Sequence, residues 1–394
     1  MNLFLFTKSF PFGKGETFLE SEINVLSNNF KEVHIFPWDR ELIQRKIPSN
    51  CIIHSLTFNE TKGLKSIIIN NLFLLVRTIL LDIKSNINRK ALLRPKAYFN
   101  DLIRALFEGQ ELKRYINKNF NDTNALLYTY WFSHWTVLLS FIKEKNQSLV
   151  TRSHGYDFNL ERNNIGYFPF RPIAYKKISC NYNVSSFGSN YLKRIHHSEK
   201  EKIRVSYLGV QNQSILSKHR SNVLVSCSNV ISLKRNALIV DVLKEMTEEI
   251  HWVHFGEGEL LNDLKIKCKE LPSNIKVTLK GHLKNSEIIE WYKNNEYNSF
   301  IHLSESEGLP VSMMEAQSFG MPIIACKVGG VGEIVNEVTG YLLPKNFTID
   351  EAINGIKKVM KFSQEKRINI QKEQQKTFSA EKNFNDFAIE IKKI

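Results

Sequence analysis

Two carboxylates, Glu307 and Glu315, flank a predicted strand-to-helix turn. The apolar run before Glu307 predicts a buried strand. Pro310 suits the first turn of the helix, because its missing N–H would have no partner there, and Gly320 suits the C-terminal cap. Free N–H groups at such a helix start favour a phosphate. A carboxylate close to a phosphate is repelled, so we expect both glutamates to bind neutral hydroxyl groups, such as those of a sugar.

A glycine turn lies near the start of the chain. Gly13 and Gly15 fall between a predicted strand and a helix predicted over Glu16–Asn28. Two glycines allow the backbone to approach a ligand closely. An ordinary tight turn explains the same pattern, so spacing alone leaves both interpretations open.

A histidine and an aspartate follow a strand predicted over Ser148–Ser153. His154 can donate or accept a proton near neutral pH, and Asp157 can bind hydroxyl groups. A solvated loop histidine is the alternative interpretation.

Two cations, Lys234 and Arg235, open a helix predicted over Arg235–Met246. A cation at that end can pair with a bound phosphate. A pair of ordinary surface charges is the alternative.

Gly256 and Gly258 follow the next predicted strand and favour a dinucleotide site at first sight. The third glycine of that fingerprint is replaced by Leu261, so the fingerprint fails. What remains is a turn that permits close approach.

Strands that alternate with helices must position all of these residues. Apolar runs predict strands at Leu3–Phe6, Val33–Phe36, Leu126–Tyr130, Ser148–Ser153, Lys177–Asn183, Arg204–Tyr207, Asn222–Ser226, His251–Phe255, Ile275–Leu279, Ser299–Leu303 and Pro322–Cys326. Such alternation gives parallel sheets covered on both faces. We therefore predict an α/β protein with two doubly wound domains, residues 1–208 and 209–375. Residues 376–394 are predicted to form a last helix that packs back toward the first domain.

The chain of 394 residues carries a formal net charge of +14. Residues 61–120 hold twelve Lys/Arg against four Asp/Glu, and they are also apolar. No run reaches the roughly 18 apolar residues of a spanning helix. A basic amphipathic helix on an anionic membrane surface is one interpretation, and a core helix with a solvated basic face is the other. No nucleic-acid-binding motif accompanies the charge, so we expect no nucleic-acid partner.

The five cysteines are scattered, odd in number and without metal-ligand spacing, which favours a reducing cytoplasm. The apolar part of the N-terminus is too short for a secretory signal. We expect a cytoplasmic protein that lies peripherally on the inner face of the cell membrane.

The order of these motifs resembles the retaining glycosyltransferases of the GT-B class, in the large family four. The family's acidic pair is present as Glu307 and Glu315, within SESEGLPVSMMEA. The glycine-rich sequence that follows it is present as Val328–Val335 and then Thr339–Pro344. The likeness runs over essentially the whole chain and is strongest over Asn222–Pro344. The opening FPFGKGETFLESEINVL resembles a bacterial subset of the family.

The resemblance implies two Rossmann-like domains that face a central cleft, with a nucleotide-sugar site in the second. Glu307 would hold hydroxyl groups of the donor sugar, Glu315 the ribose, and Lys234 would neutralise the diphosphate. The other donor-binding positions that it implies are Gly13, Gly15, Asn229, Arg235, Gly256, Leu283, Gly308, Leu309 and Pro310.

The resemblance also implies an acceptor side. His154 would lie near the reacting sugar and the acceptor hydroxyl, with Tyr156 and Asp157 beside it. In the family, an Arg commonly stands five residues before the phosphate-binding Lys, but here that position is Asn229. Either Arg235 supplies the missing charge or the leaving group is less strongly stabilised, and the sequence leaves both open.

The function implied is transfer of a sugar from a UDP- or GDP-sugar to a saccharide or lipid-linked saccharide, in surface polysaccharide assembly. No Asp-rich metal motif is visible in the sequence, and the resemblance implies neither a metal nor a cofactor. Two alternatives remain open: a nucleotide-sugar epimerase on the same fold, and a non-catalytic membrane-surface binding protein.

Overall fold

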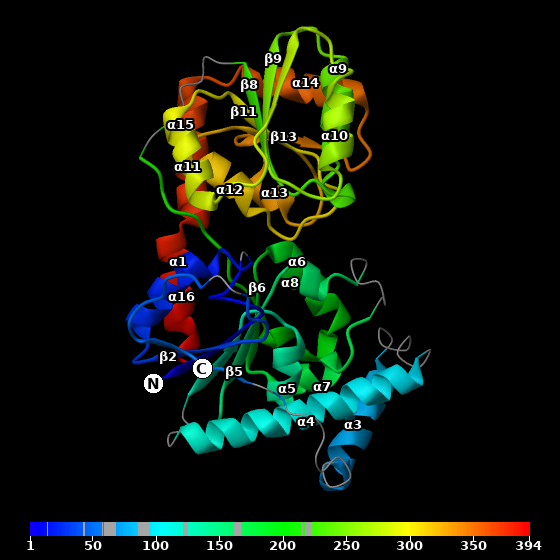
Figure 1. Cartoon of the computed structure of the whole chain (residues 1–394), viewed down its shortest axis with the longest axis vertical. Coiled ribbons are helices and arrows are strands. Elements are labelled where there is room, and N and C mark those ends of the chain that lie inside the picture. The colour runs from blue at the N-terminus through cyan, green and yellow to red at the C-terminus, as the bar shows by residue number, and fades with distance from the viewer. Residues whose placement is uncertain are drawn as a thin grey trace. The chain divides into compact units, whose positions relative to one another are not determined.

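The apolar runs of the sequence form two parallel sheets in the computed structural model (Figure 1). One unit comprises residues 1–206 and 384–394, and the other comprises residues 207–383. The structure describes residues 1–13, 15–41, 44–56, 58, 68–85, 94–120, 125–160, 167–214, 216 and 222–394. Each unit is doubly wound, which confirms the predicted fold class.

Unit 1 has a seven-stranded sheet in the order β3-β2-β1-β4-β5-β6-β7, with every pairing parallel. Its strands are β1 (Leu3–Thr7), β2 (Val33–Pro37), β3 (Cys51–Ile53), β4 (Leu126–Thr129), β5 (Leu149–Ser153), β6 (Cys180–Asn183) and β7 (Ile203–Val205).

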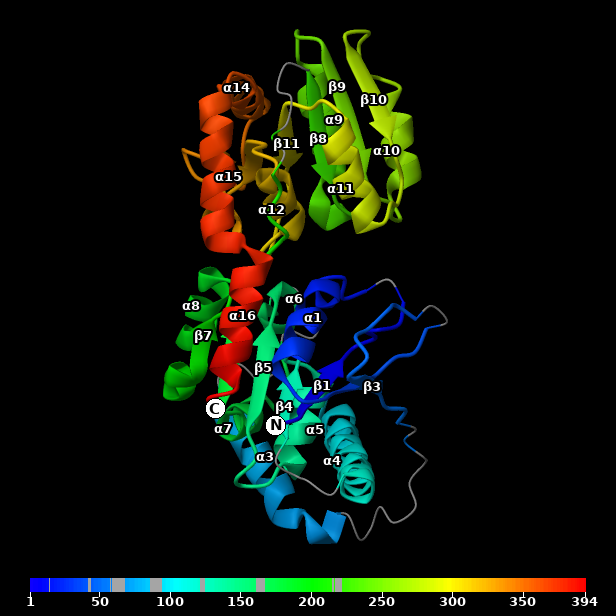
Figure 2. The same ribbon diagram turned by 90° about the vertical axis from the view of Figure 1, so that its left-hand side faces the viewer.

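Helices cover both faces of this sheet (Figure 2). They are α1 (Leu19–Asn29), α3 (Leu72–Lys84), α4 (Pro95–Asn119), α5 (His134–Ile142), α6 (Gly155–Phe158), α7 (Arg171–Lys177), α8 (Ser186–Ile195) and α16 (Ala380–Ile391). Phe4 and Phe6 of β1 pack in the core that α3, α4, α5 and α7 share. Leu3 and Leu5 pack on the opposite face with α1 and α16. Successive side chains of a strand point to opposite faces, so one short strand supplies both cores.

Unit 2 has a six-stranded parallel sheet in the order β10-β9-β8-β11-β12-β13. Its strands are β8 (Val223–Cys227), β9 (Ile250–Phe255), β10 (Ile275–Leu279), β11 (Ser299–His302), β12 (Ile323–Cys326) and β13 (Gly340–Leu343).

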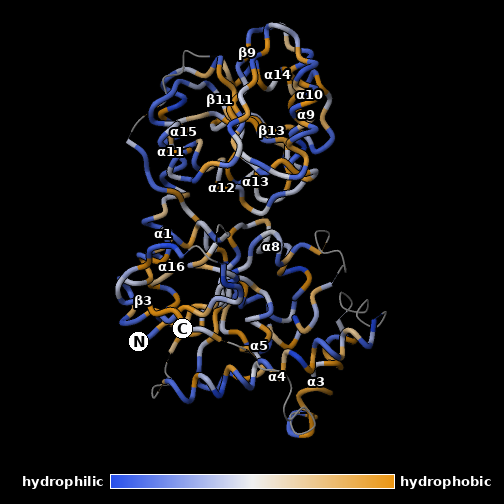
Figure 3. The backbone as a smooth tube through the Cα atoms, viewed as in Figure 1, coloured by the Kyte–Doolittle hydropathy of each residue, from blue (hydrophilic) through white to orange (hydrophobic). Residues whose placement is uncertain are grey.

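The helices of unit 2 again lie on both faces of the sheet. They are α9 (Asn236–Lys244), α10 (Leu261–Cys268), α11 (Asn285–Asn294), α12 (Val311–Ser318), α13 (Val331–Ile334), α14 (Ile349–Met360) and α15 (Gln364–Phe378). α9, α10 and α14 share one core with the sheet. α11 and α12 pack on the other face, where Tyr292 meets Phe319, and α15 packs against α12. Figure 3 shows the hydrophobic residues gathered along the central strands of each unit.

Several predicted boundaries were wrong. The first helix begins at Leu19 and not at Glu16, because Glu16 has a left-handed φ of 52° and its side chain turns back to the preceding loop. α9 begins at Asn236, because Arg235 has a φ of 50° that ends the short 3₁₀ turn Ser232–Lys234. β3 and β13 were missed, since both are short and only partly buried.

A buried ion pair crosses one core of unit 1. Nη1 of Arg152 in β5 lies 2.8 Å from Oε2 of Glu22 in α1, and both side chains are fully buried. Tyr128 donates its hydroxyl to the other oxygen of Glu22, at 3.0 Å. The guanidinium also lies 4.1 Å from the ring centroid of Phe387 in α16. One charge network therefore links a strand, the first helix and the last helix.

Replacement of Arg152 by Met would leave the Glu22 carboxylate buried without its cation. We expect the free energy of unfolding to fall by about 3–5 kcal/mol, the usual cost of breaking a buried pair on one side. Urea unfolding followed by circular dichroism measures this. The matched control is Arg204→Met, which removes a half-exposed partner of Glu390 and should cost no more than about 1 kcal/mol. Equal losses in the two variants would contradict the expectation.

Candidate functional site

The strand order of unit 2 reverses between β8 and β11. β9 and β10 lie beyond β8, whereas β12 and β13 lie beyond β11. The loops that leave the carboxyl ends of these two strands turn to opposite sides, and doubly wound sheets bind ligands at such a reversal. Lys234 follows β8 and Glu307 follows β11. The fold therefore brings these two predicted site residues to one place.

An ion pair joins the two loops. Nζ of Lys234 lies 2.6 Å from Oε1 of Glu307. Nε2 of His302, the last residue of β11, lies 2.7 Å from the same oxygen. Burial acts to raise the pKa of the Glu307 carboxyl, but the hydrogen bond from His302 and the charge of Lys234 outweigh it and hold that pKa well below its ordinary value. Among the described residues, Oε2 of Glu307 has no hydrogen-bond partner, so a ligand hydroxyl could use it.

Further hydrogen bonds hold these loops together. The amide of Glu305 donates to the carbonyl of Leu233 at 2.9 Å, and the hydroxyl of Ser304 donates to the same carbonyl at 3.1 Å. Nε of Arg235 donates to the carbonyl of Leu303 at 2.6 Å, and its Nη atoms donate to the carbonyls of Ser304 and Lys345 and to the thiol of Cys326. Arg235 thus binds the protein's own loops, while Asn229 is exposed.

Glycines let neighbouring loops interlock at this edge. A Cβ on Gly256, whose φ is 145°, would lie 1.9 Å from the carbonyl oxygen of Ser228. A Cβ on Gly329 would lie 1.8 Å from the carbonyl oxygen of Glu307. The amide of Gly330 donates to the carbonyl of Gly308 at 2.9 Å. The backbones after β8, β9, β11 and β12 therefore approach more closely than any side chain would permit.

The second predicted carboxylate, Glu315, lies on α12 and is half-buried. Nδ2 of Asn285, at the start of α11, donates to its Oε1 at 2.6 Å. Burial raises the pKa of the Glu315 carboxyl to about 7, against the lowering effect of that hydrogen bond. Leu283 is half-buried in the loop just before α11.

The residues between the two glutamates form a buried turn. Gly308, Leu309 and Pro310 are all buried. Pro310 immediately precedes α12 instead of occupying its first turn, and Gly320 follows the helix with a left-handed φ of 73°. The turn therefore places a helix N-terminus, which favours anions, beside the Lys234–Glu307 pair.

Unit 1 has its own reversal, between β1 and β4. Here the carboxylate of Glu16 accepts hydrogen bonds from the amides of Lys8, Ser9 and Phe10, at 2.7–2.9 Å. Nε1 of Trp131, which follows β4, donates to Glu16 at 2.7 Å. The loop that contains Gly13 and Gly15 is therefore closed by an internal carboxylate. A Cβ on Gly13 would overlap the side chain of Glu41, whereas Gly15 has ordinary room.

His154 lies beside this closed loop. Its ring centroid is 4.2 Å from that of Trp131 and 4.9 Å from that of Tyr130. Burial, together with the charge of Arg152, holds the pKa of the imidazole well below its ordinary value, so the ring is neutral at pH 7. Within the described part of the chain, neither ring nitrogen has a hydrogen-bond partner. A buried polar group of this kind needs a partner, and a ligand could supply it.

Asp157 accepts hydrogen bonds from the backbone around His154. Its Oδ1 accepts from the amide of His154 at 2.5 Å, and its Oδ2 accepts from the amide of Phe132 at 2.9 Å. Burial raises the pKa of this carboxyl to about 7, against the charge of Arg171. Tyr156 is exposed. The two residues predicted for the acceptor side therefore differ: Asp157 holds the loop, and only Tyr156 presents its side chain to solvent.

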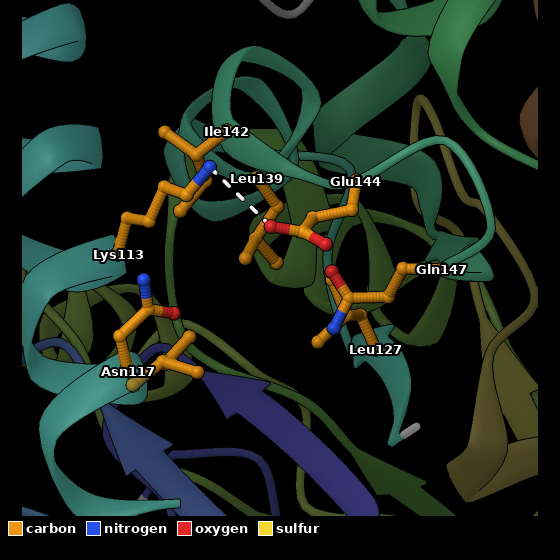
Figure 4. A pocket seen from close by; sticks show the side chains of 8 residues that line it. Lys113, Asn117, Leu127, Leu139, Ile142, Glu144 and Gln147 are labelled. Atoms are coloured by element: carbon orange, nitrogen blue, oxygen red, sulfur yellow. Dashed lines mark ion pairs between the residues drawn. The ribbon is translucent and has the colours of Figure 1, made fainter. Parts of the chain in front are cut away.

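A small pocket in unit 1 lies away from these residues (Figure 4). Lys113 and Asn117 of α4, Leu139 and Ile142 of α5, and Glu144 before β5 line it, and an ion pair of 3.5 Å joins Lys113 to Glu144. The segment before β5 lies at the amino end of that strand, opposite the ligand edge. The pocket therefore adds nothing to the candidate site. Over the residues that the structure describes, no three His, Cys, Asp or Glu side chains are placed to hold a metal ion.

The sequence did not single out His302, Glu16 or Trp131. A single histidine at the end of an apolar strand has no distinguishing pattern. The sequence predicts a helix at Glu16, and in the FPFGKGETF segment only the glycines form a recognisable pattern. The only signal for Trp131 was a position directly after a predicted strand.

Comparison with known proteins agrees with this arrangement. Residues 210–377 match the family model of the glycosyl transferases group 1. An *Escherichia coli* relative, the UDP-Gal:alpha-D-GlcNAc-diphosphoundecaprenol alpha-1,3-galactosyltransferase, is 34% identical over 120 residues. That match covers 30% of this chain and 29% of the relative, so it spans less than a third of the relative's length.

Two solved structures share the fold along the full length of both chains. The lipopolysaccharide outer core galactosyltransferase WaaB has a TM-score of 0.69 at 15% identity. HepE from *Anabaena*, solved in complex with UDP, has a TM-score of 0.68 at 15% identity. Residues 210–377 therefore match the glycosyl transferases group 1, in a chain with the fold of the GT-B glycosyltransferases.

Proposed function

We propose that this protein is a retaining glycosyltransferase that moves a sugar from a nucleotide-sugar to a saccharide or lipid-linked saccharide in surface polysaccharide biosynthesis. The observation that carries the proposal is the Lys234–Glu307 ion pair at the reversal of the second sheet. The *E. coli* relative is named for a UDP-Gal donor and a diphosphoundecaprenol-linked acceptor, and HepE was solved with UDP. These names favour a UDP-sugar over a GDP-sugar.

The donor site that we propose uses residues of unit 2. Oε2 of Glu307 accepts a hydrogen bond from a hydroxyl of the donor sugar, and the Glu315 carboxylate accepts hydrogen bonds from the ribose hydroxyls. Lys234, the start of α12 and the amides of the glycine turns stabilise the diphosphate. Preorganised donors of this kind act most strongly where negative charge develops on the leaving group.

Transfer with retention follows from these roles. The bond between the anomeric carbon and the phosphate oxygen breaks, and the acceptor oxygen forms its bond to that carbon on the same face. The acceptor proton passes to the departing phosphate. No carboxylate is assigned as a nucleophile in this scheme. His154, a neutral imidazole whose ring nitrogens have no hydrogen-bond partner among the described residues, binds the reacting sugar or the acceptor hydroxyl on unit 1.

We also propose that unit 1 contacts an anionic membrane on the cytoplasmic side, through α3. An exposed stripe of large apolar side chains runs along this helix, at Leu72, Phe73, Val76, Leu80 and Ile83, and Ile69 just before the helix is exposed as well. Leu75, Thr78 and Asp82 are buried on the other side. Arg77 and Lys84 are exposed on the same helix, and Arg94 and Lys96 are exposed at the start of α4. Apolar area with flanking cations suits an anionic bilayer surface.

Residues 61–67 and 86–93 of the basic stretch 61–120 lie outside the described residues. In the part of the chain that the structure describes, no helix combines the length and the apolar content needed to cross a bilayer.

A thermal-shift screen of nucleotide-sugars tests the function. A ligand present at about 100 times its dissociation constant adds about 2.7 kcal/mol of stability, which a shift in melting temperature reports. The stabilising donor is then incubated with lipid-linked saccharides, and transfer is followed by mass spectrometry. An isomerised sugar formed without acceptor would indicate an epimerase, and stabilisation without any turnover would indicate a binding protein.

Glu307→Ala and Lys234→Ala should each reduce transfer by about 10²-fold or more, the scale of losing one preorganised charge contact. The matched control is Glu305→Ala. It removes a half-exposed carboxylate from the same loop, where Glu305 pairs with Lys345 at 3.3 Å, and it should leave transfer near the wild-type rate. Near wild-type turnover in both folded site variants would refute these two assignments.

Affinity for UDP should rise between pH 6 and pH 8. The pKa of Glu315 is raised to about 7, so the carboxylate that accepts ribose hydroxyls is a minority below that pH and predominates above it. Calorimetry at several pH values measures the change. Glu315→Gln should make the affinity for UDP less dependent on pH. An unchanged pH profile in that variant would mean that a group other than Glu315 titrates.

The triple variant Leu72→Ser, Phe73→Ser, Val76→Ser should bind vesicles containing phosphatidylglycerol at least about tenfold more weakly, because each side chain contributes apolar area to the bilayer contact. Co-sedimentation at low and high salt measures this. Ile266→Ser, at an exposed apolar position on α10 of unit 2, is the control. Failure of the wild-type protein to bind such vesicles at any salt concentration would remove the proposal.

A further inference from the structure

Oε1 of Glu307 has two donors of different mobility. Lys234 reaches it from a loop, on a flexible four-carbon side chain that is one-fifth exposed. His302 reaches it from β11, where its Cα is in register with that of Ala325 on β12. The His302 side chain is 4% exposed, and its ring lies parallel to that of Phe300, 6.4 Å away. One donor is therefore fixed by the sheet, and the other can move.

The direction of the His302 hydrogen bond follows from its partner. The pKa of Glu307 is held well below its ordinary value, so the carboxyl is ionised near neutral pH and can only accept. Nε2 of His302 therefore carries the proton and donates the hydrogen bond to Oε1 of Glu307. This bond does not involve Lys234, and it persists if Lys234 turns to another anion.

We propose that His302 is a positioning residue, which holds Glu307 toward the donor sugar while Lys234 leaves that carboxylate for the diphosphate. The inference rests on the proposed donor site. Without His302, departure of Lys234 would leave a buried carboxylate with no donor among the described side chains, which is costly. With it, Oε1 stays bound and Oε2 stays directed to the ligand, so binding of the phosphates and the sugar does not compete for one cation.

Two titratable side chains among the described residues contact the Glu307 carboxylate. Lys234 from the loop after β8 and His302 from β11 are its two side-chain partners. The loop after β12 meets it through the backbone of Gly329. Glu305 in the same loop is paired with Lys345. Removal of the His302 donor should therefore raise the pKa of Glu307, because burial then has less opposing it.

Two substitutions separate positioning from packing. His302→Gln keeps an N–H donor at a similar reach, whereas His302→Leu removes the donor and keeps apolar volume. We expect His302→Leu to raise the midpoint of the ¹³C-carboxyl titration of Glu307, assigned by comparison with Glu307→Gln, and His302→Gln to leave it closer to wild type. His251→Leu, in which the lost histidine bonds to Thr278 on the neighbouring strand, is the matched control.

Ligand binding supplies the second readout. In His302→Leu, the KM for the nucleotide-sugar should rise about tenfold or more, the usual effect of losing a hydrogen bond to a charged group, while the Kd of free UDP stays near wild type. His302→Gln should recover most of the loss. A merely structural role would weaken UDP and UDP-sugar alike, and that result would overturn the proposal.

The remaining outcomes also decide. An unchanged Glu307 titration in His302→Leu would refute the positioning role. If His302→Leu does not fold, the Glu307 titration and the KM of His302→Gln decide. If His302→Gln folds but behaves like Glu307→Ala, the proposal is refuted. A wild-type protein that binds no nucleotide-sugar would refute the proposed function, whereas the carboxyl titration would still test the contact between His302 and Glu307.

Discussion

The contacts that converge on Oε1 of Glu307 join the loops at the centre of the carboxyl edge of unit 2. A buried carboxylate is stable only where donors surround it, and here the donors come from two different strand ends. Lys234 therefore ties the loop after β8 to the loop after β11, and His302 ties that second loop to the end of its own strand. Glycines let the flanking loops pack onto these two, because a Cβ on Gly256 would meet the carbonyl of Ser228 and a Cβ on Gly329 would meet the carbonyl of Glu307.

Unit 1 uses a carboxylate differently at the corresponding reversal of its sheet. Glu16 accepts hydrogen bonds from three consecutive backbone amides and from Trp131. The donors that could bind an anionic ligand there are therefore occupied by the Glu16 carboxylate. In unit 2 the carboxylate retains one oxygen without a partner among the described residues, and a cation lies beside it. The same topological position is closed in one sheet and equipped for a polar ligand in the other.

Much of the fold was predictable, because buried parallel strands form apolar runs whatever their tertiary partners. β3 and β13 were not predicted because their apolar runs, CII and YLL, are only three residues long and both strands are only partly buried. Glu307, Glu315 and Lys234 were found by motif and by position after strands. The direct contact between Lys234 and Glu307 was not, because a sequence gives no distance between loops 73 residues apart.

The sequence predicts separate roles for Glu307 and Lys234, sugar binding for the first and phosphate binding for the second. Separate roles do not indicate that the two side chains form an ion pair. His302 illustrates the same limit. Its role comes from the register of β11 and from the turn that returns Glu307 to the strand end, and neither is encoded in a local pattern. Backbone conformation was similarly hidden at Glu16 and Arg235, which adopt left-handed φ values that few side chains favour.

The last helix has a consequence for the order in which the protein matures. Phe387, Ala388 and Ile391 complete one core of unit 1, although the whole of unit 2 separates them in the chain from the other residues of that core. Unit 2 is continuous and can fold as soon as it has left the ribosome. Unit 1, whose first strand is made earliest, must wait for residues synthesised after all of unit 2. Until then, the Phe387 side of Arg152 and the part of this core that α16 covers remain open in the nascent chain.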